Sequence, residues 1–251
     1  MDVYEELEPM IWAFISGVEE YKIRIGITSK EEDIRVDKAM EIAKDMQLFL
    51  EDEEDYDVQF IENMVEKYKA DHNISVLVID YLELTAGCIA EYSQLTKGMS
   101  VREDQVLLNL SARVKNIAKR YFITIFGYTQ TTDEARRDGV RDARAVKGAR
   151  SLPNKADVGI TVFEPTKKEL ELIEPFIEKK AGLGKNIIPN TIYTIYKNRG
   201  GQIKSVMIWC HQNLGNMRVI DLFCTDKFYN LILVDKTEVS FLDNIENENA
   251  N

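Results

Sequence analysis

Residues 75–84 read SVLVIDYLEL, and this stretch decides the fold. The four apolar residues at 76–79 predict a buried strand, and Asp80 follows them directly. An acid at the carboxyl end of a strand in an α/β sheet projects into the crevice where ligands bind, and Mg²⁺ prefers oxygen ligands. Asp80 is therefore a candidate magnesium ligand. The alternative is that Asp80 caps the turn that follows the strand.

Helix and strand patterns alternate on both sides of this strand. Helices are expected at 4–16, about 30–46, 58–72 and 103–121, and strands at 48–51, 76–80, 123–130, 158–164, 191–198, 203–210 and 218–223. Two capping boxes, Ser29 with Glu32 and Ser100 with Glu103, mark helix starts. The helix from 103 has an apolar stripe of Val106, Leu110, Val114 and Ile117.

This order of elements predicts an α/β fold. Early strands separated by helices indicate a mostly parallel sheet with helices on both faces, and the later run of strands indicates an antiparallel hairpin extension. Residues 1–223 are expected to form one domain, and 224–251 a last strand with an acidic tail.

Composition limits the functional classes. The 251 residues are 45% hydrophobic and 30% charged, which is ordinary for a globular protein, and no apolar run is long enough to span a membrane. Cys88, Cys210 and Cys224 are odd in number and widely spaced, which predicts reduced thiols in a cytoplasm. A net charge of −11 argues against general affinity for nucleic acid, so any such contact is expected to be local.

The basic residues gather between 131 and 150. Arg137, Arg141, Arg144 and Lys147 recur every three or four residues and would form one stripe on a helix, with Arg150 close behind. Arginine and lysine pair well with backbone phosphates, so these five residues are candidate DNA contacts. The alternative is a solvated face that the acids of the same stretch balance.

Two further positions carry chemistry. Gln130 ends the expected strand 123–130, where an amide could sense a γ-phosphate or its attacking water; a polar strand end is the alternative. Lys197 and Arg199 lie two residues apart in the hairpin YKNRGGQIKSV (196–206). They could deliver positive charge to a transferring phosphoryl group, or simply solubilise the hairpin.

Two tempting signals are set aside. GLGKN (182–186) looks like the end of a phosphate-binding loop, but it lacks the first glycine and the final Ser or Thr. The neighbouring Cys210 and His211 lack the spacing of metal ligands.

Taken in order, these segments resemble the C-terminal RecA-like motor domain of the DnaB family of replicative DNA helicases. VLVIDYLEL (76–84) is similar to the Walker B strand of that family, and ITIFGYTQTT (123–132) to its sensor strand. KGARSLPNKADVGITV (147–162) resembles the segment that leads into the next strand, and YKNRGGQ (196–202) matches the Lys-x-Arg-x-Gly hairpin.

The resemblance implies an ATPase of the RecA-like, P-loop NTPase type. It implies a hexameric ring that moves 5′→3′ along single-stranded DNA with ATP and Mg²⁺. Asp80 would hold Mg²⁺ through water, and Gln130 would couple the phosphate state to the DNA loop. Lys197 and Arg199 would act in trans on the neighbour's nucleotide, and residues 131–152 would line the channel.

The sequence also departs from the family pattern. Glu83 replaces the usual Gln, the stretch from Lys147 is less acidic than usual, and an insertion at about 165–186 is expected to be a surface excursion. No phosphate-binding loop occurs, and Met1 is expected to fall just after the catalytic glutamate.

These departures predict an incomplete site. The missing part is expected to come from a separate polypeptide, as in an interrupted, phage-encoded gene, so that this chain alone neither binds ATP tightly nor hydrolyses it. Loss of a central strand predicts unpaired sheet edges, an uncovered apolar face, and poor stability or association. The alternatives are a non-catalytic DNA-binding or helicase-regulating module on a degenerate RecA-like fold and, less favoured, a recombinase relative.

Overall fold

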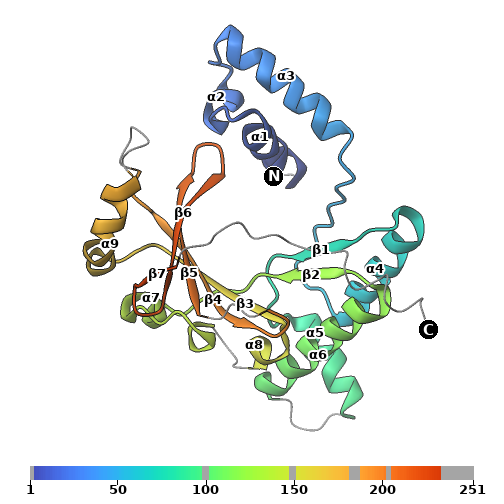
Figure 1. The fold of residues 1–251 in the computed structure, drawn as a ribbon. Helices are drawn as coiled ribbons and strands as arrows, with labels where there is room; N and C mark the ends of the chain where they lie inside the picture. Colours follow the sequence, from blue (N-terminus) through green and yellow to red (C-terminus); the bar gives the residue numbers. More distant parts are fainter. Residues whose placement is uncertain (1–2, 98–101, 147–150, 181–186, 202–204, 233–251) are drawn as a thin grey trace, which may run out of the picture.

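The computed structural model describes residues 3–97, 102–146, 151–180, 187–201 and 205–232. Within them a group of helices from the N-terminus stands beside two sheets with their own covering helices (Figure 1). The α/β class predicted from the sequence is confirmed. No helix in these ranges is long and apolar enough to cross a membrane.

The elements alternate early and turn to strands late, as expected. The helices are α1 (Val3–Ser16), α2 (Glu20–Ile25), α3 (Lys30–Lys44), α4 (Val58–His72), α5 (Ala86–Leu95), α6 (Glu103–Tyr121), α7 (Asp133–Asp138), η1 (Ala143–Ala145), α8 (Ser151–Lys155) and α9 (Lys167–Lys180). The strands are β1 (Val76–Ile79), β2 (Thr124–Gly127), β3 (Val158–Phe163), β4 (Thr191–Asn198), β5 (Val206–Asn213), β6 (Arg218–Asp226) and β7 (Leu231–Ile232).

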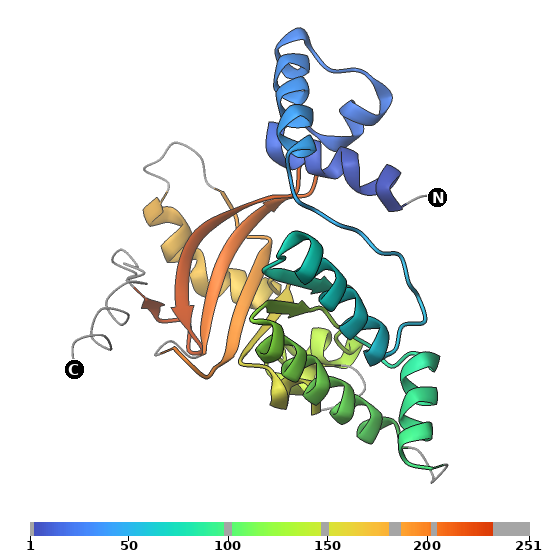
Figure 2. The same ribbon diagram turned by 90° about the vertical axis from the view of Figure 1, so that its right-hand side faces the viewer.

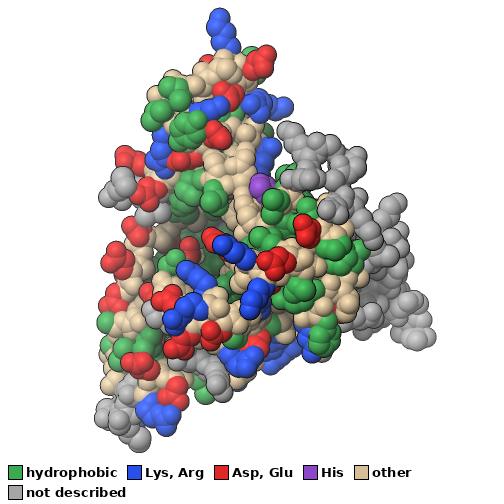
Figure 3. All heavy atoms as spheres, turned by 90° about the vertical axis from the view of Figure 1, so that its left-hand side faces the viewer, with side chains coloured by type: hydrophobic (Ala, Val, Ile, Leu, Met, Phe, Trp, Pro, Cys, Tyr) green, Lys and Arg blue, Asp and Glu red, His purple; other side chains and the backbone are tan. Residues whose placement is uncertain are grey.

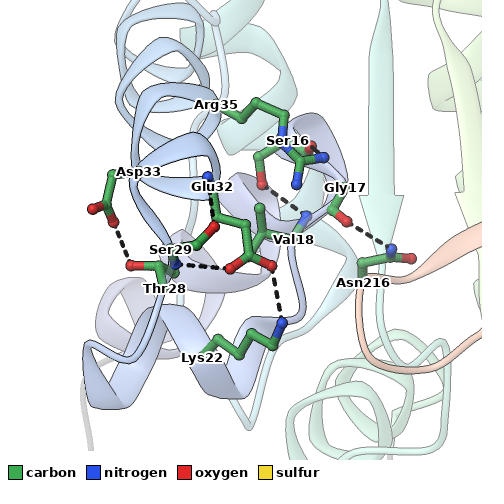
Figure 4. Close-up of polar contacts among 10 residues, drawn as sticks. All are labelled: Ser16, Gly17, Val18, Lys22, Thr28, Ser29, Glu32, Asp33, Arg35 and Asn216. Carbon is green, nitrogen blue, oxygen red and sulfur yellow. Dashed lines mark hydrogen bonds and ion pairs between the residues drawn. The ribbon is translucent and has the colours of Figure 1, made fainter.

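The N-terminal helices α1–α3 are joined to the rest by an extended segment at 45–57 (Figure 2). The expected strand at 48–51 lies in this segment and does not form, because an apolar LFLE finds no partner strand there. The tip between β5 and β6 holds the helices. Arg218 donates to the carbonyls of Phe14 and Ile15 at 2.8 Å each. Asn216 Nδ2 donates to Gly17 O at 3.2 Å (Figure 4).

The capping box at the start of α3 is confirmed. Ser29 Oγ accepts from Glu32 N at 3.3 Å, and Glu32 Oε2 accepts from Ser29 N at 2.9 Å (Figure 4). Lys22 Nζ donates to Glu32 Oε1 at 2.9 Å. The hydrogen bond from the Ser29 backbone, and then that from Lys22, lower the pKa of Glu32 to about 2.

β1 and β2 form a two-stranded parallel sheet that packs on α4 and α6. The four residues of the expected stripe on α6 are all buried. They belong to a core made of Tyr56, Val58, Ile61, Val65, Ile79, Cys88, Val106, Leu107, Leu110, Val114, Ile117 and Ile123. This core fixes the sheet from one side, so its carboxyl ends have a defined position.

The second sheet is antiparallel throughout, in the order β3-β4-β5-β6-β7. Its core joins Ile192, Met207 and Trp209 to Ile173 of α9. The expectation of a surface excursion at about 165–186 is therefore wrong for α9, because apolar residues at helical spacing seal it onto the sheet with Ile173 fully buried. In the described residues the parallel part is one pair of strands, and the antiparallel extension is larger than expected.

The expected uncovered apolar face is present. Val76 and Val78 of β1 and Phe126 of β2 are 51–56% exposed on one face of the parallel pair. Val158, Ile160 and Val162 alternate with buried residues on β3 and are 48–51% exposed. Among the residues that the structure describes, neither β1, β2 nor β3 has a partner on its other edge.

Candidate functional site

Asp80 directly follows β1, whereas Gln130 lies three residues beyond β2, because β2 ends at Gly127 and not at the expected residue 130. Ile79 lies beside Gly127 in the parallel register, so the residues that follow them emerge at the same edge. Tyr128 N donates to Ile79 O at 2.9 Å, and this bond holds the two strand ends together. Both Asp80 and Gln130 are exposed, as a residue that meets a ligand requires. Asp80 and the segment that leads to Gln130 therefore leave the parallel pair at the same edge.

The turn that directly follows β1 is at Asp80 and Tyr81, so a cap on that turn stays the alternative role of Asp80. The next helix, α5, is capped by Thr85, whose Oγ1 accepts from Cys88 N at 3.1 Å.

Tyr56 fixes the loop that follows Asp80, and the sequence reasoning missed it. The hydroxyl of Tyr56 donates to Tyr81 O at 2.8 Å and accepts from Glu83 N at 3.0 Å. The Tyr56 carbonyl accepts from Thr85 Oγ1 at 2.5 Å. Burial raises the pKa of Tyr56 to about 12, so the hydroxyl stays protonated. The one signal in the sequence was an aromatic residue inside the acidic run EDEEDYD (51–57).

The donor set at this edge fits a loosely held magnesium ion. Mg²⁺ usually keeps several waters and is bound through one or two carboxylates together with substrate phosphates. Asp80 supplies one exposed carboxylate. No group of three or more His, Cys, Asp or Glu residues in the described part is arranged to hold a metal ion. The residues present thus suit contact through water, with phosphates completing the shell.

Lys197 and Arg199 converge on the carboxyl end of α8. Lys197 Nζ donates to Pro153 O at 2.7 Å and to Asn154 O at 2.9 Å. Arg199 Nη2 donates to the same Asn154 O at 2.8 Å. The last carbonyls of a helix lack partners within it and attract cations. The two predicted residues are thus brought together by α8, which the sequence reasoning did not identify.

An open pocket of about 420 Å³ lies between Lys197 and the basic stretch. Its lining residues are Asp142, Ala143, Arg144, Pro153, Asn154, Tyr196 and Lys197. Tyr196 lies so close to β3 that a Cβ on Gly159 would be 2.4 Å from its ring. Only glycine fits at that position, and the close approach sets one wall of the pocket.

The predicted basic stripe does not form. α7 ends at Gly139, which has a φ of +65°, and a short 3₁₀ turn follows at Ala143–Ala145. Arg137, Arg141 and Arg144 therefore do not share one helical face. A glycine in the left-handed region ends the helix, and this overrides the three-to-four spacing of the arginines.

Arg141 is a structural residue, which corrects its prediction as a DNA contact. Its guanidinium binds Glu169 through two hydrogen bonds of 2.9 and 2.6 Å, and these side chains are only 10% and 7% exposed. It also lies over the ring of Phe163 at 5.2 Å. Burial raises the pKa of Glu169, but hydrogen bonds from Arg141 and Thr166 outweigh it and hold that pKa low.

The other basic candidates differ in their setting. Arg137 is exposed, and Arg144, whose side chain is 67% exposed, pairs with Asp142 at 2.8 Å. Lys147 and Arg150 lie outside the described residues. On the face drawn in Figure 3, Lys and Arg side chains lie among Asp and Glu side chains. The described part thus leaves Arg137 and Arg144 as candidate DNA contacts.

Comparison with known proteins identifies the family. Residues 4–218 match the family described as DnaB-like helicase C terminal domain. The chain belongs to this family. The resemblance to this family is confirmed, and the matched range contains Asp80, Gln130, Lys197 and Arg199.

Two relatives and one solved structure show how the DnaB-like chain compares. It is 30% identical over 239 residues to the SPbeta prophage-derived uncharacterized protein YorI of Bacillus subtilis (strain 168), covering 94% of this chain and 46% of YorI. It is 26% identical over 101 residues to the replicative DNA helicase DnaB of Rickettsia felis, covering 38% of this chain and 20% of that protein. A solved structure described as a DnaB-like replicative helicase and its interactions with primase superposes with a TM-score of 0.65 at 13% identity, covering 88% of this chain and 49% of that one.

These comparisons confirm the RecA-like helicase fold of the DnaB-like chain. The matched region spans less than half the length of YorI and of the Rickettsia helicase. The activity of a whole helicase is therefore a matter for proposal.

Proposed function

We propose that this DnaB-like chain is part of an ATP-dependent replicative helicase that moves 5′→3′ along single-stranded DNA in a hexameric ring. The observation that supports the proposal is the shared edge of the parallel pair, from which Asp80 and the segment that leads to Gln130 both emerge. An acid and an amide at the carboxyl ends of neighbouring strands suit a site that handles the phosphates of a nucleotide.

Each residue has a proposed role. Asp80 binds Mg²⁺ through water; the bound ion supplies charge that stabilises the transferring phosphoryl group. Gln130 orients the attacking water or senses the γ-phosphate. Lys197 and Arg199 act in trans on the nucleotide of a neighbouring subunit, as an arginine finger does. Arg137 and Arg144 contact the DNA backbone; Lys147 and Arg150 keep that role as sequence predictions.

We further propose that residues outside this sequence supply the phosphate-binding loop and the catalytic carboxylate. The sequence holds no GxxxxGK[ST] motif, and exposed apolar side chains on β1, β2 and β3 offer a surface for a partner. The setting would be the cytoplasm of a bacterial cell or a phage-infected host. Similarity to a prophage protein supports the phage origin.

The alternative is a non-catalytic DNA-binding or helicase-regulating module on the same fold. The lack of a phosphate-binding motif in the sequence favours it as much as it favours a divided enzyme. The two hypotheses differ in whether any assembly that contains this chain hydrolyses ATP.

One experiment separates these hypotheses. The DNA upstream of the Met1 codon is sequenced, any reading frame there is co-expressed with this chain, and ATP hydrolysis is measured with single-stranded DNA. We expect a frame that encodes GxxxxGK[ST], hydrolysis by the pair, and neither turnover nor micromolar ATP binding by this chain alone. If the upstream sequence lacks that motif and no hydrolysis is measured, the module is favoured. Turnover by this chain alone contradicts the division of the site.

In the hydrolysing assembly, Arg199→Ala should abolish turnover and leave nucleotide binding largely intact, because a finger stabilises charge that develops in the transition state. Arg102→Ala serves as a control, since Arg102 is an exposed arginine far along the chain that pairs with Asp104 at 2.7 Å. Retained turnover in Arg199→Ala removes the finger role.

A further inference from the structure

Asp157 lies at the centre of the basic cluster that contains the proposed finger pair. Lys115 Nζ, from the middle of α6, donates to Asp157 Oδ1 at 2.5 Å and to Lys155 O at 3.3 Å. Arg199 Nη1 lies 3.8 Å from the same Oδ1. The Arg199 backbone N also donates to Asp157 O at 2.9 Å. One residue thus contacts Arg199 through both its backbone and its carboxylate.

The positive charges of this cluster repel one another unless a negative charge lies among them. Lys115, Lys197 and Arg199 bring three cations to one carboxylate and the last carbonyls of α8. Burial, and then the nearby charges of Arg199 and Lys115, lower the pKa of Lys197, whereas Asp157 raises it. The hydrogen bond from Lys115 lowers the pKa of Asp157, so its carboxylate stays charged. Without that charge the cations would repel one another and spread apart.

We propose that Asp157, held in place by Lys115, is a positioning residue that fixes Lys197 and Arg199 against the carboxyl end of α8. The inference rests on the proposed finger role of the pair. Lys197 and Arg199 share one acceptor, Asn154 O, so the two cations move as a unit with α8. Through its ion pair with Lys115, Asp157 connects Lys197 and Arg199 to α6. The two side chains are therefore held by a helix as well as by the hairpin that carries them. A finger is effective only when its charge is aimed before the reaction begins.

The placement is tested on this chain alone by NMR of labelled lysine and arginine side chains. Lys197 is titrated in the presence of the charged groups that act on it, which are Lys115 of α6, Asp157 before β3 and Arg199 after β4. Asp157→Asn should lower the pKa of Lys197 further and speed the rotation of the Arg199 guanidinium. Lys115→Met removes the group that holds Asp157 while keeping most of the aliphatic stem, so it should speed the rotation of the Arg199 guanidinium as Asp157→Asn does.

Two matched variants make the test specific. Lys119→Met removes a cation from the same helix that has no hydrogen bond to Asp157 among the described contacts, and it should leave the Lys197 and Arg199 signals unchanged. Asp157→Glu keeps the charge and should bring both signals back toward those of the original chain. Unchanged Lys197 and Arg199 signals in Asp157→Asn would overturn the proposal, as would equal effects of Lys119→Met and Lys115→Met.

The same variants separate this inference from the finger role in a hydrolysing assembly. Asp157→Asn should lower kcat roughly tenfold or more and leave KM within about twofold, because it changes the position of the Arg199 guanidinium and not the binding of the nucleotide. If Arg199→Ala abolishes turnover and Asp157→Asn has no effect, the finger stands and the positioning role fails. If Arg199→Ala keeps full turnover, the finger role itself fails, whatever the NMR signals show.

Discussion

Tyr56 shows how a single side chain can set the geometry of a site to which it contributes no ligand. Its hydroxyl bridges Tyr81 O and Glu83 N, and thereby fixes the backbone on the carboxyl side of Asp80. Tyr56→Phe leaves both backbone groups without this partner, and we expect the free energy of unfolding to fall by about 1–3 kcal/mol. Urea denaturation measures the change, and Tyr21→Phe, at a half-exposed tyrosine, is the control.

The pH dependence of the same variant gives a second measurement. The folded state raises the pKa of Tyr56 to about 12 from an ordinary 10.0, so the neutral hydroxyl favours the folded state below pH 10. That contribution is lost as the pH rises from about 10 to about 12. The original chain should therefore lose more stability across this window than Tyr56→Phe does. Parallel stability curves for the two proteins would contradict the assignment.

Arg141 and Arg144 look alike in the sequence and differ in the structure. Arg141→Ala leaves the buried Glu169 without its partner, which should cost about 3–5 kcal/mol of unfolding free energy. Arg144 is exposed, so Arg144→Ala should leave stability nearly unchanged and instead weaken salt-dependent binding to single-stranded DNA. Denaturation and DNA titration of both variants check this, and equal stabilities would refute the division.

At the scale of elements, the start of α3 gives a prediction in acid. Glu32 has its pKa lowered from 4.5 to about 2, chiefly by the Ser29 backbone hydrogen bond, so its carboxylate favours the folded helix above about pH 4.5 (Figure 4). This contribution is lost as the pH falls toward about 2. Glu32→Gln should remove that acid sensitivity from α1–α3, as followed by hydrogen exchange of their amides. Glu31→Gln, in the same first turn but outside the capping box, should leave it unchanged.

Elements whose signals are local could be predicted from the sequence. The Ser29 capping box, the stripe on α6 and the strand before Asp80 each depend on neighbours within one or two turns, and all three are confirmed. The strand expected at 48–51 does not form, because no partner strand lies beside it in the described residues. The basic stripe does not form, because Gly139 in the left-handed region ends α7.

The candidate site follows the same division. The sequence placed Asp80 and Gln130 at one edge, since parallel strands share their carboxyl ends. It could not reveal that Tyr56 reaches Tyr81, that Lys115 reaches Asp157, or that Arg141 reaches Glu169. These pairs lie far apart along the chain and follow no period, so only the folded structure shows them.

At the scale of the whole molecule, the apolar face of the parallel pair governs the behaviour of the isolated chain. Val78 and Phe126 are 56% and 52% exposed and lie side by side in the register. Contiguous apolar surface of this kind, beside unpaired strand edges, promotes association. We therefore expect the purified chain to self-associate at micromolar concentration and to unfold without a sharp transition.

A pair of variants attributes that association to the face itself. Val78→Thr combined with Phe126→Thr keeps residues that favour strands and lowers the apolar area, so the chain should shift toward monomer in sedimentation and bind less hydrophobic dye. Leu214→Thr is the control, because Leu214 is 75% exposed in the turn between β5 and β6, away from this face. Since Leu214 lies outside the apolar face of β1 and β2, its replacement should leave association unchanged. A sharp monomeric unfolding transition of the original chain at ordinary temperature would show that the exposed face needs no partner.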